Sequence, residues 1–215
     1  PMVVQLTDKC KEVCEMMNVA DMQVVKGDKL VPIMEGASEE APVYHMILQF
    51  TMDDKIVIGG EEYPIPVSNR LILFYDKIHK ITPIDQCFFD YWNTHTDKIA
   101  SYLASGFDAV IDTKIMEERL DQLCAHFETM RRANPDFIFY LEGAYYMNPE
   151  VKEMLFKRLA PYANIIGTNE EELVAQNEKY GVMTDVSNLD SVIEGLDSMM
   201  ERYGIKGVVL HTKDY

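Results

Sequence analysis

The segment IIGTNEEELVAQ, residues 165–176, passes from apolar residues typical of a buried strand into three consecutive glutamates. Asn169 and Glu172 are three positions apart, which places them on one face of the first turn of the predicted helix. Thr168 or Asn169 is a suitable N-cap residue, and Glu171 or Glu172 would complete a capping box. An amide and a carboxylate in this position could also hold Mg²⁺ through water. We expect helix capping here, and metal binding is an alternative that is compatible with it.

Apolar runs and helical patterns alternate around this segment, from residue 85 to the end of the sequence. Near-continuous apolar runs are typical of strands in a parallel sheet whose faces are covered by helices. The pattern predicts an α/β fold with a doubly wound, mainly parallel sheet flanked by helices. Strands are expected at residues 107–113, 136–142, 164–168 and 205–212, and helices at residues 85–104, 115–132, 149–159, 170–179 and 189–203.

The N-terminal third has a different pattern. Apolar residues recur at helical spacing from Leu6 to Met17, which predicts an amphipathic helix within the first 18 residues. Short β-rich runs separated by turn residues follow, and they predict an antiparallel or meandering sheet. We therefore expect a β-rich lobe at residues 20–75 and an α/β domain formed by residues 1–19 and 76–215.

The composition restricts the class of partner. The chain has 215 residues, 47% of them hydrophobic, and a formal net charge of −16. A chain this acidic is a poor candidate for binding nucleic acid or an anionic membrane, which basic patches attract. The cysteines lack CxxC spacing, which argues against a zinc site and for reduced thiols. No signal-peptide pattern or run of 18 apolar residues is present, so we expect a cytoplasmic protein.

Polar residues follow several expected strands at their carboxyl ends, where ligands bind in doubly wound folds. They are Asp112-Thr113-Lys114, Glu142 and the cluster from Thr168 to Glu172. Because Glu142 and the cluster follow consecutive strands, we expect them on one side of the sheet.

The order of these segments resembles that of the ADP-dependent sugar kinases, the glucokinases and phosphofructokinases of the ribokinase-like superfamily. Asn169-Glu170-Glu171-Glu172 resembles the NxxE motif of that family, and Tyr140-Leu141-Glu142 stands where the family has HxE. The runs YHMILQF (44–50) and VSNRLILF (67–74) resemble its lid segment, and VVLHTKDY (208–215) resembles its His-Thr strand. The resemblance covers essentially the whole chain. It implies a ribokinase-like α/β domain with a small β lid that closes over a sugar.

The resemblance implies a segment of a kinase that transfers a phosphoryl group from ADP to glucose or fructose 6-phosphate, in glycolysis. Glu142 and Glu172 would then organise Mg²⁺ together with Asn169. Arg70 would reach from the lid to the nucleotide phosphates, because a guanidinium fork suits phosphate oxygens. Lys114 is a weaker candidate for the same task. The implied partners are a sugar or sugar phosphate and a nucleotide, whereas the residues alone leave a surface ion pair open for Arg70.

The chain departs from the family pattern at three places. Tyr140 replaces the His of HxE, Gln49 replaces a Glu of the lid strand, and the residues around Asp112–Lys114 replace a Ser-Gly-x-Gln sequence. The last departure leaves the identity of the sugar open. The family's catalytic Asp lies in a Gly-Ala-Gly-Asp loop, which we expect beyond Tyr215, and its sugar-binding stretch is expected before Pro1. No catalytic residue is therefore assigned in this chain, and the α/β domain is expected to be incomplete at both ends.

Two other interpretations stay open at this point. The departures are compatible with a non-catalytic relative that serves as a binding or scaffolding module. The acidic helix caps of an unrelated α/β domain could also imitate the motif. The aromatic run FFDYW, residues 88–92, is expected to form the apolar face of a helix, with a partner surface as the alternative. The histidines are expected to be structural: His45, His79, His95, His126 and His211.

Overall fold

The computed structural model describes residues 2–43, 45–74 and 78–212. Tyr44, Tyr75 and residues 213–215, which the sequence pattern assigned to strands or strand-like motifs, lie outside the described residues. The helices are α1 (Lys11–Asn18), α2 (Ile78–Ile81), α3 (Gln86–Thr94), α4 (Thr113–Ala133), α5 (Pro149–Leu159), α6 (Glu170–Glu178) and α7 (Leu189–Tyr203). Short 3₁₀ turns are η1 (Ile33–Gly36), η2 (Thr96–Lys98) and η3 (Ala160–Tyr162). The strands are β1 (Met2–Val3), β2 (Met22–Lys26), β3 (Lys29–Pro32), β4 (His45–Phe50), β5 (Lys55–Ile58), β6 (Glu61–Pro64), β7 (Asn69–Phe74), β8 (Ser101–Ala104), β9 (Ile138–Glu142), β10 (Ile165–Asn169) and β11 (Gly207–His211).

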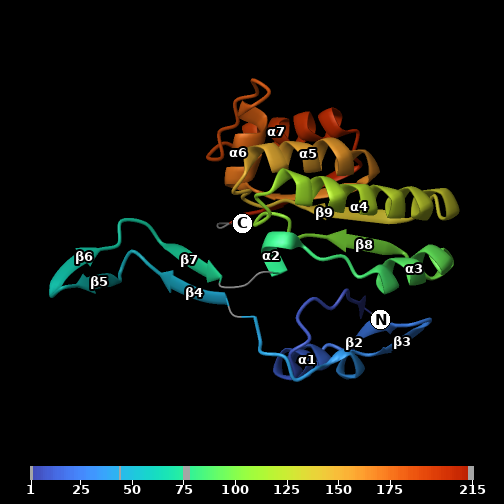
Figure 1. Cartoon of the computed structure of the whole chain (residues 1–215). Helices are drawn as coiled ribbons and strands as arrows, with labels where there is room; N and C mark the ends of the chain where they lie inside the picture. The colour runs from blue at the N-terminus through green and yellow to red at the C-terminus, as the bar shows by residue number, and fades with distance from the viewer. Residues whose placement is uncertain (1, 44, 75–77, 213–215) are drawn as a thin grey trace.

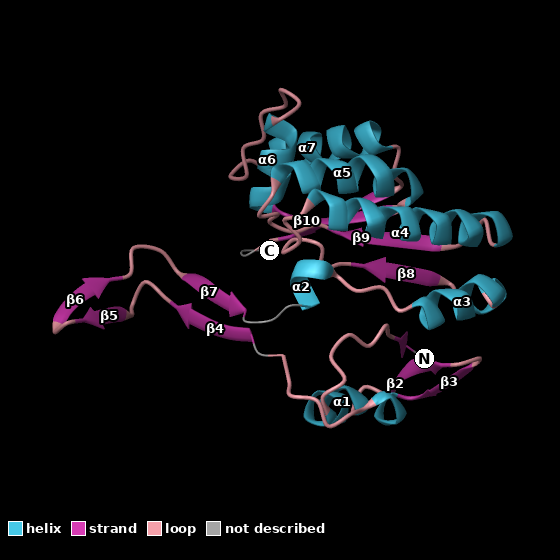
Figure 2. Ribbon diagram, viewed as in Figure 1, coloured by secondary structure: helices cyan, strands magenta, loops and turns pink. Residues whose placement is uncertain are grey.

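A parallel sheet with the strand order β8-β9-β10-β11 forms the centre of the α/β part. Ile166 of β10 lies beside Leu141 of β9 and Val208 of β11. Strands that follow one another through right-handed crossovers place their connecting helices on the same face. Figure 2 shows this layer, with α4, α5, α6 and α7 on one side of the strands. The α/β class with a parallel sheet flanked by helices is confirmed.

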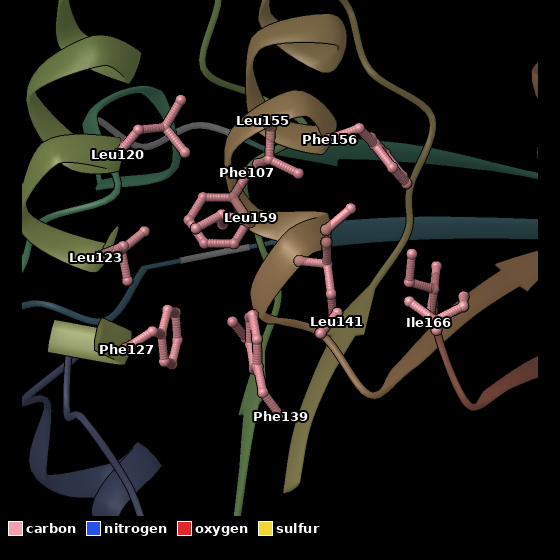
Figure 3. Close-up of a cluster of buried hydrophobic side chains, with 14 of the residues drawn as sticks. Phe107, Leu120, Leu123, Phe127, Phe139, Leu141, Leu155, Phe156, Leu159 and Ile166 are labelled. Carbon is pink, nitrogen blue, oxygen red and sulfur yellow. The ribbon is translucent and has the colours of Figure 1, made fainter. Parts of the chain in front are cut away.

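The main core lies between this sheet and its helix layer. Phe139 and Leu141 are buried on the face of β9 that meets the helices, because alternate side chains of a strand point to opposite faces. Phe127 of α4 stacks on Phe139 with ring centroids 4.0 Å apart. Helices α4 and α5 contribute Leu120, Leu123, Leu155, Phe156 and Leu159, while Phe107 comes from a loop and Ile166 from β10 (Figure 3).

The N-terminal residues form a small sheet of their own. There β2 pairs antiparallel with β3, and the short strand β1 pairs parallel with β2. Cys14 of α1, Val24 of β2 and Ile33 of η1 form a second buried cluster beneath it. Helix α3 packs against β2 as well as α4, so it connects this sheet to the α/β part.

A long antiparallel ribbon, residues 45–74, projects from the rest of the molecule (Figure 1). Its strands pair as β4 with β7 and β5 with β6. The antiparallel pairing predicted for residues 20–75 is therefore observed, but the strands fall into separate sheets. The turn η1 and a non-strand segment after it interrupt the chain between β3 and β4, which prevents one continuous meander.

The helix predicted within the first 18 residues is observed as α1, whereas two other predicted elements differ from the structure. The helix predicted for residues 85–104 ends at Thr94, so that β8 occupies Ser101–Ala104. The strand predicted for residues 107–113 is a loop. Its Phe107 and Val110 are apolar because they are buried in the core, and short apolar runs do not distinguish a strand from other buried segments.

Across the described ranges, every helix is too short or too polar to cross a membrane.

Candidate functional site

Asn169 and Glu172 form a complete capping box at the carboxyl end of β10. Asn169 Oδ1 accepts a hydrogen bond from the Glu172 backbone N–H at 2.9 Å, and Glu172 Oε2 accepts one from the Asn169 N–H at 3.1 Å. The Asn169 side-chain amide also donates to Glu172 Oε1 at 2.7 Å. The predicted cap is confirmed, and the second carboxylate oxygen makes it more extensive than a standard capping box. Glu170 and Glu171 occupy the same first turn, where negative charge complements the helix dipole.

Glu142 ends β9 and is held by residues from two strands. Its Oε1 lies 3.3 Å from His211 Nε2 on β11, and it accepts a hydrogen bond from the Tyr140 hydroxyl. Burial, with this hydrogen bond, raises the pKa of Tyr140 to about 12, so the hydroxyl remains a donor at neutral pH. A Cβ at Gly167 of β10 would overlap both the Glu142 carboxylate and the Tyr140 hydroxyl. The contacts of Glu142 thus span β10 only because Gly167 has no side chain.

The two candidate carboxylates influence each other at this edge of the sheet. Burial raises the pKa of Glu172, and the negative charge of Glu142 raises it further, while the Asn169 backbone hydrogen bond and the Lys152 charge act in the opposite direction. The backbone N–H of Gly143 donates to Gly167 O at 2.8 Å, which joins the ends of β9 and β10. The structure therefore brings Glu142, Asn169 and Glu172 to one edge of the sheet.

The arrangement fits Mg²⁺ only with ligands from outside these side chains. Within the described residues, no group of three or more His, Cys, Asp or Glu side chains could hold a metal ion. Magnesium keeps several waters and commonly uses one or two carboxylates together with substrate phosphates. Glu142 and Glu172 supply such oxygens, and a cation would offset the cost of ionising the half-buried Glu172. The donor set therefore suits a phosphate-bound magnesium ion better than a metal site made by the protein alone.

Arg70 lies away from these residues, on β7 of the ribbon. Its side chain is exposed, and its cross-strand partner on β4 is Gln49. Among the described residues it forms no ion pair, so the surface ion pair left open by the sequence is not found there. Because Gln49 is neutral, it does not compensate the positive charge of Arg70.

Asp112 and Lys114, the other polar residues expected near the sheet edge, mark the beginning of α4. Asp112 Oδ1 accepts hydrogen bonds from the backbone N–H groups of Lys114 at 2.8 Å and Ile115 at 3.4 Å. Asp112 therefore caps α4, and the Lys114 side chain is exposed to solvent.

The histidines divide into a core residue, a site residue and others. His126 is buried, stacks on Phe89 with centroids 4.3 Å apart, and bonds Asn93 through Nδ1 at 2.7 Å. His211, expected to be structural, contacts Glu142. It ends β11 in register with Asn169 on β10, and this register comes from strand pairing and is not visible in the spacing along the chain. The aromatic run around Phe89 is buried as expected for the apolar face of a helix.

Comparison with known proteins gives a consistent picture. The model of the family described as "ADP-specific Phosphofructokinase/Glucokinase conserved region" matches residues 3–215. No curated protein sequence matches the chain at the level required. The structure is similar to that of the last common ancestor of ADP-dependent phosphofructokinases from Methanosarcinales, with a TM-score of 0.69 and 16% identity over 95% of this chain and 46% of that one.

Two further solved structures show the same fold. One is an ADP-dependent kinase in complex with fructose 6-phosphate and ADPβS, with a TM-score of 0.66 and 14% identity over 89% of this chain and 44% of that one. The other is a hypothetical ADP-dependent phosphofructokinase from Pyrococcus horikoshii OT3, with a TM-score of 0.65 and 15% identity over 89% of this chain and 46% of that one. The chain thus spans less than half the length of the solved structures that it resembles.

Proposed function

Because the chain belongs to the ADP-specific phosphofructokinase/glucokinase family, we propose that it is part of a kinase that phosphorylates a sugar with ADP. The acceptor is glucose or fructose 6-phosphate, and a similar protein in complex with fructose 6-phosphate favours the second. The observation that carries the proposal is the meeting of Glu142, Asn169 and Glu172 at the carboxyl edge of the sheet, where doubly wound folds bind ligands. This reaction would place the protein in glycolysis, in the cytoplasm.

Each candidate residue has a role that its surroundings support. Glu142 and Glu172 hold Mg²⁺ directly or through water, and Asn169 orients Glu172 through its amide. Tyr140 and His211 fix the Glu142 carboxylate from two strands. Bound magnesium would neutralise phosphate charge, which is the main requirement of phosphoryl transfer. We assign no general base within residues 1–215.

The ribbon serves as the lid in this proposal. Arg70 lies on β7, which pairs with β4, and its cross-strand neighbour Gln49 is neutral. The guanidinium of Arg70 is therefore available to phosphate oxygens. Closure of the ribbon over the sheet edge would exclude water from the transferring group.

The test uses the polypeptide encoded by the complete reading frame that contains this chain. We expect ADP consumption that depends on fructose 6-phosphate or glucose. Glu142→Gln and Glu172→Gln should each lower kcat/KM by about 100-fold. The neutral amide would hold Mg²⁺ less tightly than the carboxylate does, and Mg²⁺ stabilises the negative charge that develops on the phosphoryl group. Glu172→Gln keeps one of the two oxygens that accept hydrogen bonds from Asn169, so the free energy of unfolding should fall by about 1 kcal/mol.

Glu170→Gln is the matched control, since Glu170 lies in the same turn but outside the capping box. Electron paramagnetic resonance of Mn²⁺ with ADP gives a readout that does not depend on turnover. Binding of sugar and nucleotide without turnover would instead favour the non-catalytic relative. Absence of both binding and turnover would overturn the proposal.

A further inference from the structure

A groove of about 950 Å³ lies between α5 and α6, on the helix layer of the molecule. Helix α5 packs against α4, while α6 packs against α7, so the seam between α5 and α6 is open. Asn169 and Glu172 belong to its lining, whereas Glu142, Tyr140 and His211 do not. The groove therefore runs away from the sheet edge along the helices.

Aromatic side chains form much of the lining. Phe156 of α5 and Tyr203 of α7 lie with ring centroids 5.6 Å apart, and Tyr146 lies 6.2 Å from Phe156. Tyr180 is half exposed at the side of the groove, with the Arg202 guanidinium carbon 4.0 Å from its ring centroid. Such surfaces bind planar rings through stacking and apolar contact.

Three of the four cations that line the groove, Lys152, Lys157 and Arg202, form no salt bridge within the described part of the chain, although the whole chain carries a net charge of −16. Arg202 is bonded only to neutral groups, Asn177 Oδ1 and Ser198 Oγ. The fourth cation, Lys179, pairs with Glu153 at 3.1 Å.

The Lys152 ammonium is half buried, and burial lowers its pKa. The charge of Glu172 raises that pKa, whereas the charge of Lys179, which pairs with Glu153, lowers it. An anion beside Lys152 would replace the hydration that the ammonium group has lost on burial.

Tyr146 adds a donor without a partner. The residue is only 7% exposed, and its hydroxyl is buried with no hydrogen-bond partner within the described part of the chain. Buried polar groups are nearly always paired, so an orphan hydroxyl in the lining of a groove indicates a ligand or an ordered water.

We propose that the α5–α6 groove is a second ligand site, which binds a small molecule composed of a planar aromatic ring system and one anionic group. The rings of Phe156, Tyr180 and Tyr203 contact the aromatic part, and Lys152 with Arg202 attracts the carboxylate or phosphate. The proposal does not rest on the kinase activity, although the groove shares Asn169 and Glu172 with the candidate magnesium site.

Isothermal titration calorimetry with three probes tests the site. The probes are 2-naphthoate, 2-naphthyl phosphate and the neutral 2-naphthalenemethanol. We expect both anions to bind at least about tenfold more tightly than the alcohol, which is the effect of one charge-assisted interaction. The stronger of the two anions identifies the preferred group as carboxylate or phosphate.

Variants locate the binding. Lys152→Gln should reduce the affinity for the anions about tenfold and leave the alcohol unaffected. Lys206→Gln, at an exposed position outside the groove, is the charge-matched control and should change neither. Ala175→Trp, at an exposed position of α6, should fill the groove and abolish binding of all three probes while circular dichroism shows a folded protein.

The opposite results would overturn the proposal. They are equal binding of the anions and the alcohol, no binding of any probe, and unchanged binding to the Ala175→Trp variant. Displacement of 2-naphthoate by ADP with Mg²⁺ would also overturn it, because the groove would then be part of the nucleotide site.

Discussion

Gly167 carries no side chain, and the Glu142 carboxylate and the Tyr140 hydroxyl occupy the space beside it. The absence of a side chain at this residue therefore allows Glu142 of β9 to contact His211 of β11 across β10. The φ angle of Gly167 lies outside the left-handed region, so its backbone conformation is open to any residue. Its importance is steric, and this separates it from the turn glycines of the chain.

Substitution of Gly167 by alanine should destabilise the protein, although it adds only one methyl group. We expect Gly167→Ala to lower the free energy of unfolding by about 1–3 kcal/mol, because the added methyl group must displace Glu142 and Tyr140. Gly207→Ala is the matched control, since a Cβ at Gly207 of β11 has no atom within 4 Å. Its effect should stay within about 0.5 kcal/mol. Urea unfolding measures both, and equal effects would show that the Glu142 contacts adapt freely.

A buried histidine should make stability depend on pH. Burial lowers the pKa of His126 from 6.5 to about 4, so the folded state favours the neutral ring. This contribution to stability is fully present above pH 6.5 and is lost as the pH falls towards 4. Between pH 7 and pH 5 the protein should lose about 2 kcal/mol more than the variant His126→Gln. Urea unfolding at the two pH values tests this, and parallel losses in both proteins would contradict it.

Arg131 of α4 connects three elements at the amino end of the sheet. Its guanidinium donates to Phe137 O at 3.0 Å, to Tyr162 O at 2.6 Å and to Asn164 Oδ1 at 2.9 Å. Asn164 Oδ1 also accepts from the backbone N–H of Phe139 at 2.8 Å. One planar fork thus fixes the end of α4 against the starts of β9 and β10, which a lysine with its single ammonium group cannot reproduce.

Adjacent arginines allow a controlled test of this connection. Arg131→Lys should lower the free energy of unfolding by about 1.5–3 kcal/mol, because carbonyl groups lose charge-assisted hydrogen bonds. Arg132→Lys makes the same chemical change on the exposed side of α4, where Arg132 only pairs with Glu128. Its effect should stay below about 0.5 kcal/mol. Similar values for the two variants would show that Arg131 does not hold these elements together.

The elements that the sequence predicted well are those with two independent signals. Helices α4, α5 and α7 have a capping residue as well as helical periodicity, and Asn148 and Asn188 cap two of them as the residue types indicate. Helix α6 lacks clear periodicity, and its cap Asn169 was the signal for it. The loop at residues 105–112 had only apolar composition, which tertiary burial explains as well as strand pairing does. The distinction depends on which segment fills the sheet position, and a single sequence does not contain that information.

The candidate site was predictable to the extent that it is local. The Asn169–Glu172 capping box follows from their spacing, because an N-cap residue and its reciprocal partner are three positions apart. The contact of His211 with Glu142 requires the register of three strands, and the unpaired charge of Lys152 requires the packing of α5. Neither is visible in the spacing along the chain.

The molecule as a whole combines a well-packed part with a thin one. The parallel sheet and its helices bury most of the large apolar side chains. The ribbon, in contrast, keeps apolar side chains such as Ile47, Val57 and Leu71 at least 47% exposed. A two-stranded ribbon is marginally stable by itself, so the free energy of local opening should differ strongly between these parts.

Hydrogen exchange measured by mass spectrometry should reveal this difference. Amides of β4 and β7 should exchange at least about 100-fold faster than those of β9 and β10, because the ribbon can open without disturbing the core. If the ribbon is a lid, fructose 6-phosphate with ADP and Mg²⁺ should slow exchange in β4 and β7 of the polypeptide from the complete reading frame. Comparable protection of ribbon and sheet without ligands would show that the ribbon is packed against other residues. Exchange in the ribbon that ligands leave unchanged, while calorimetry shows them bound, would exclude its closure over the sugar.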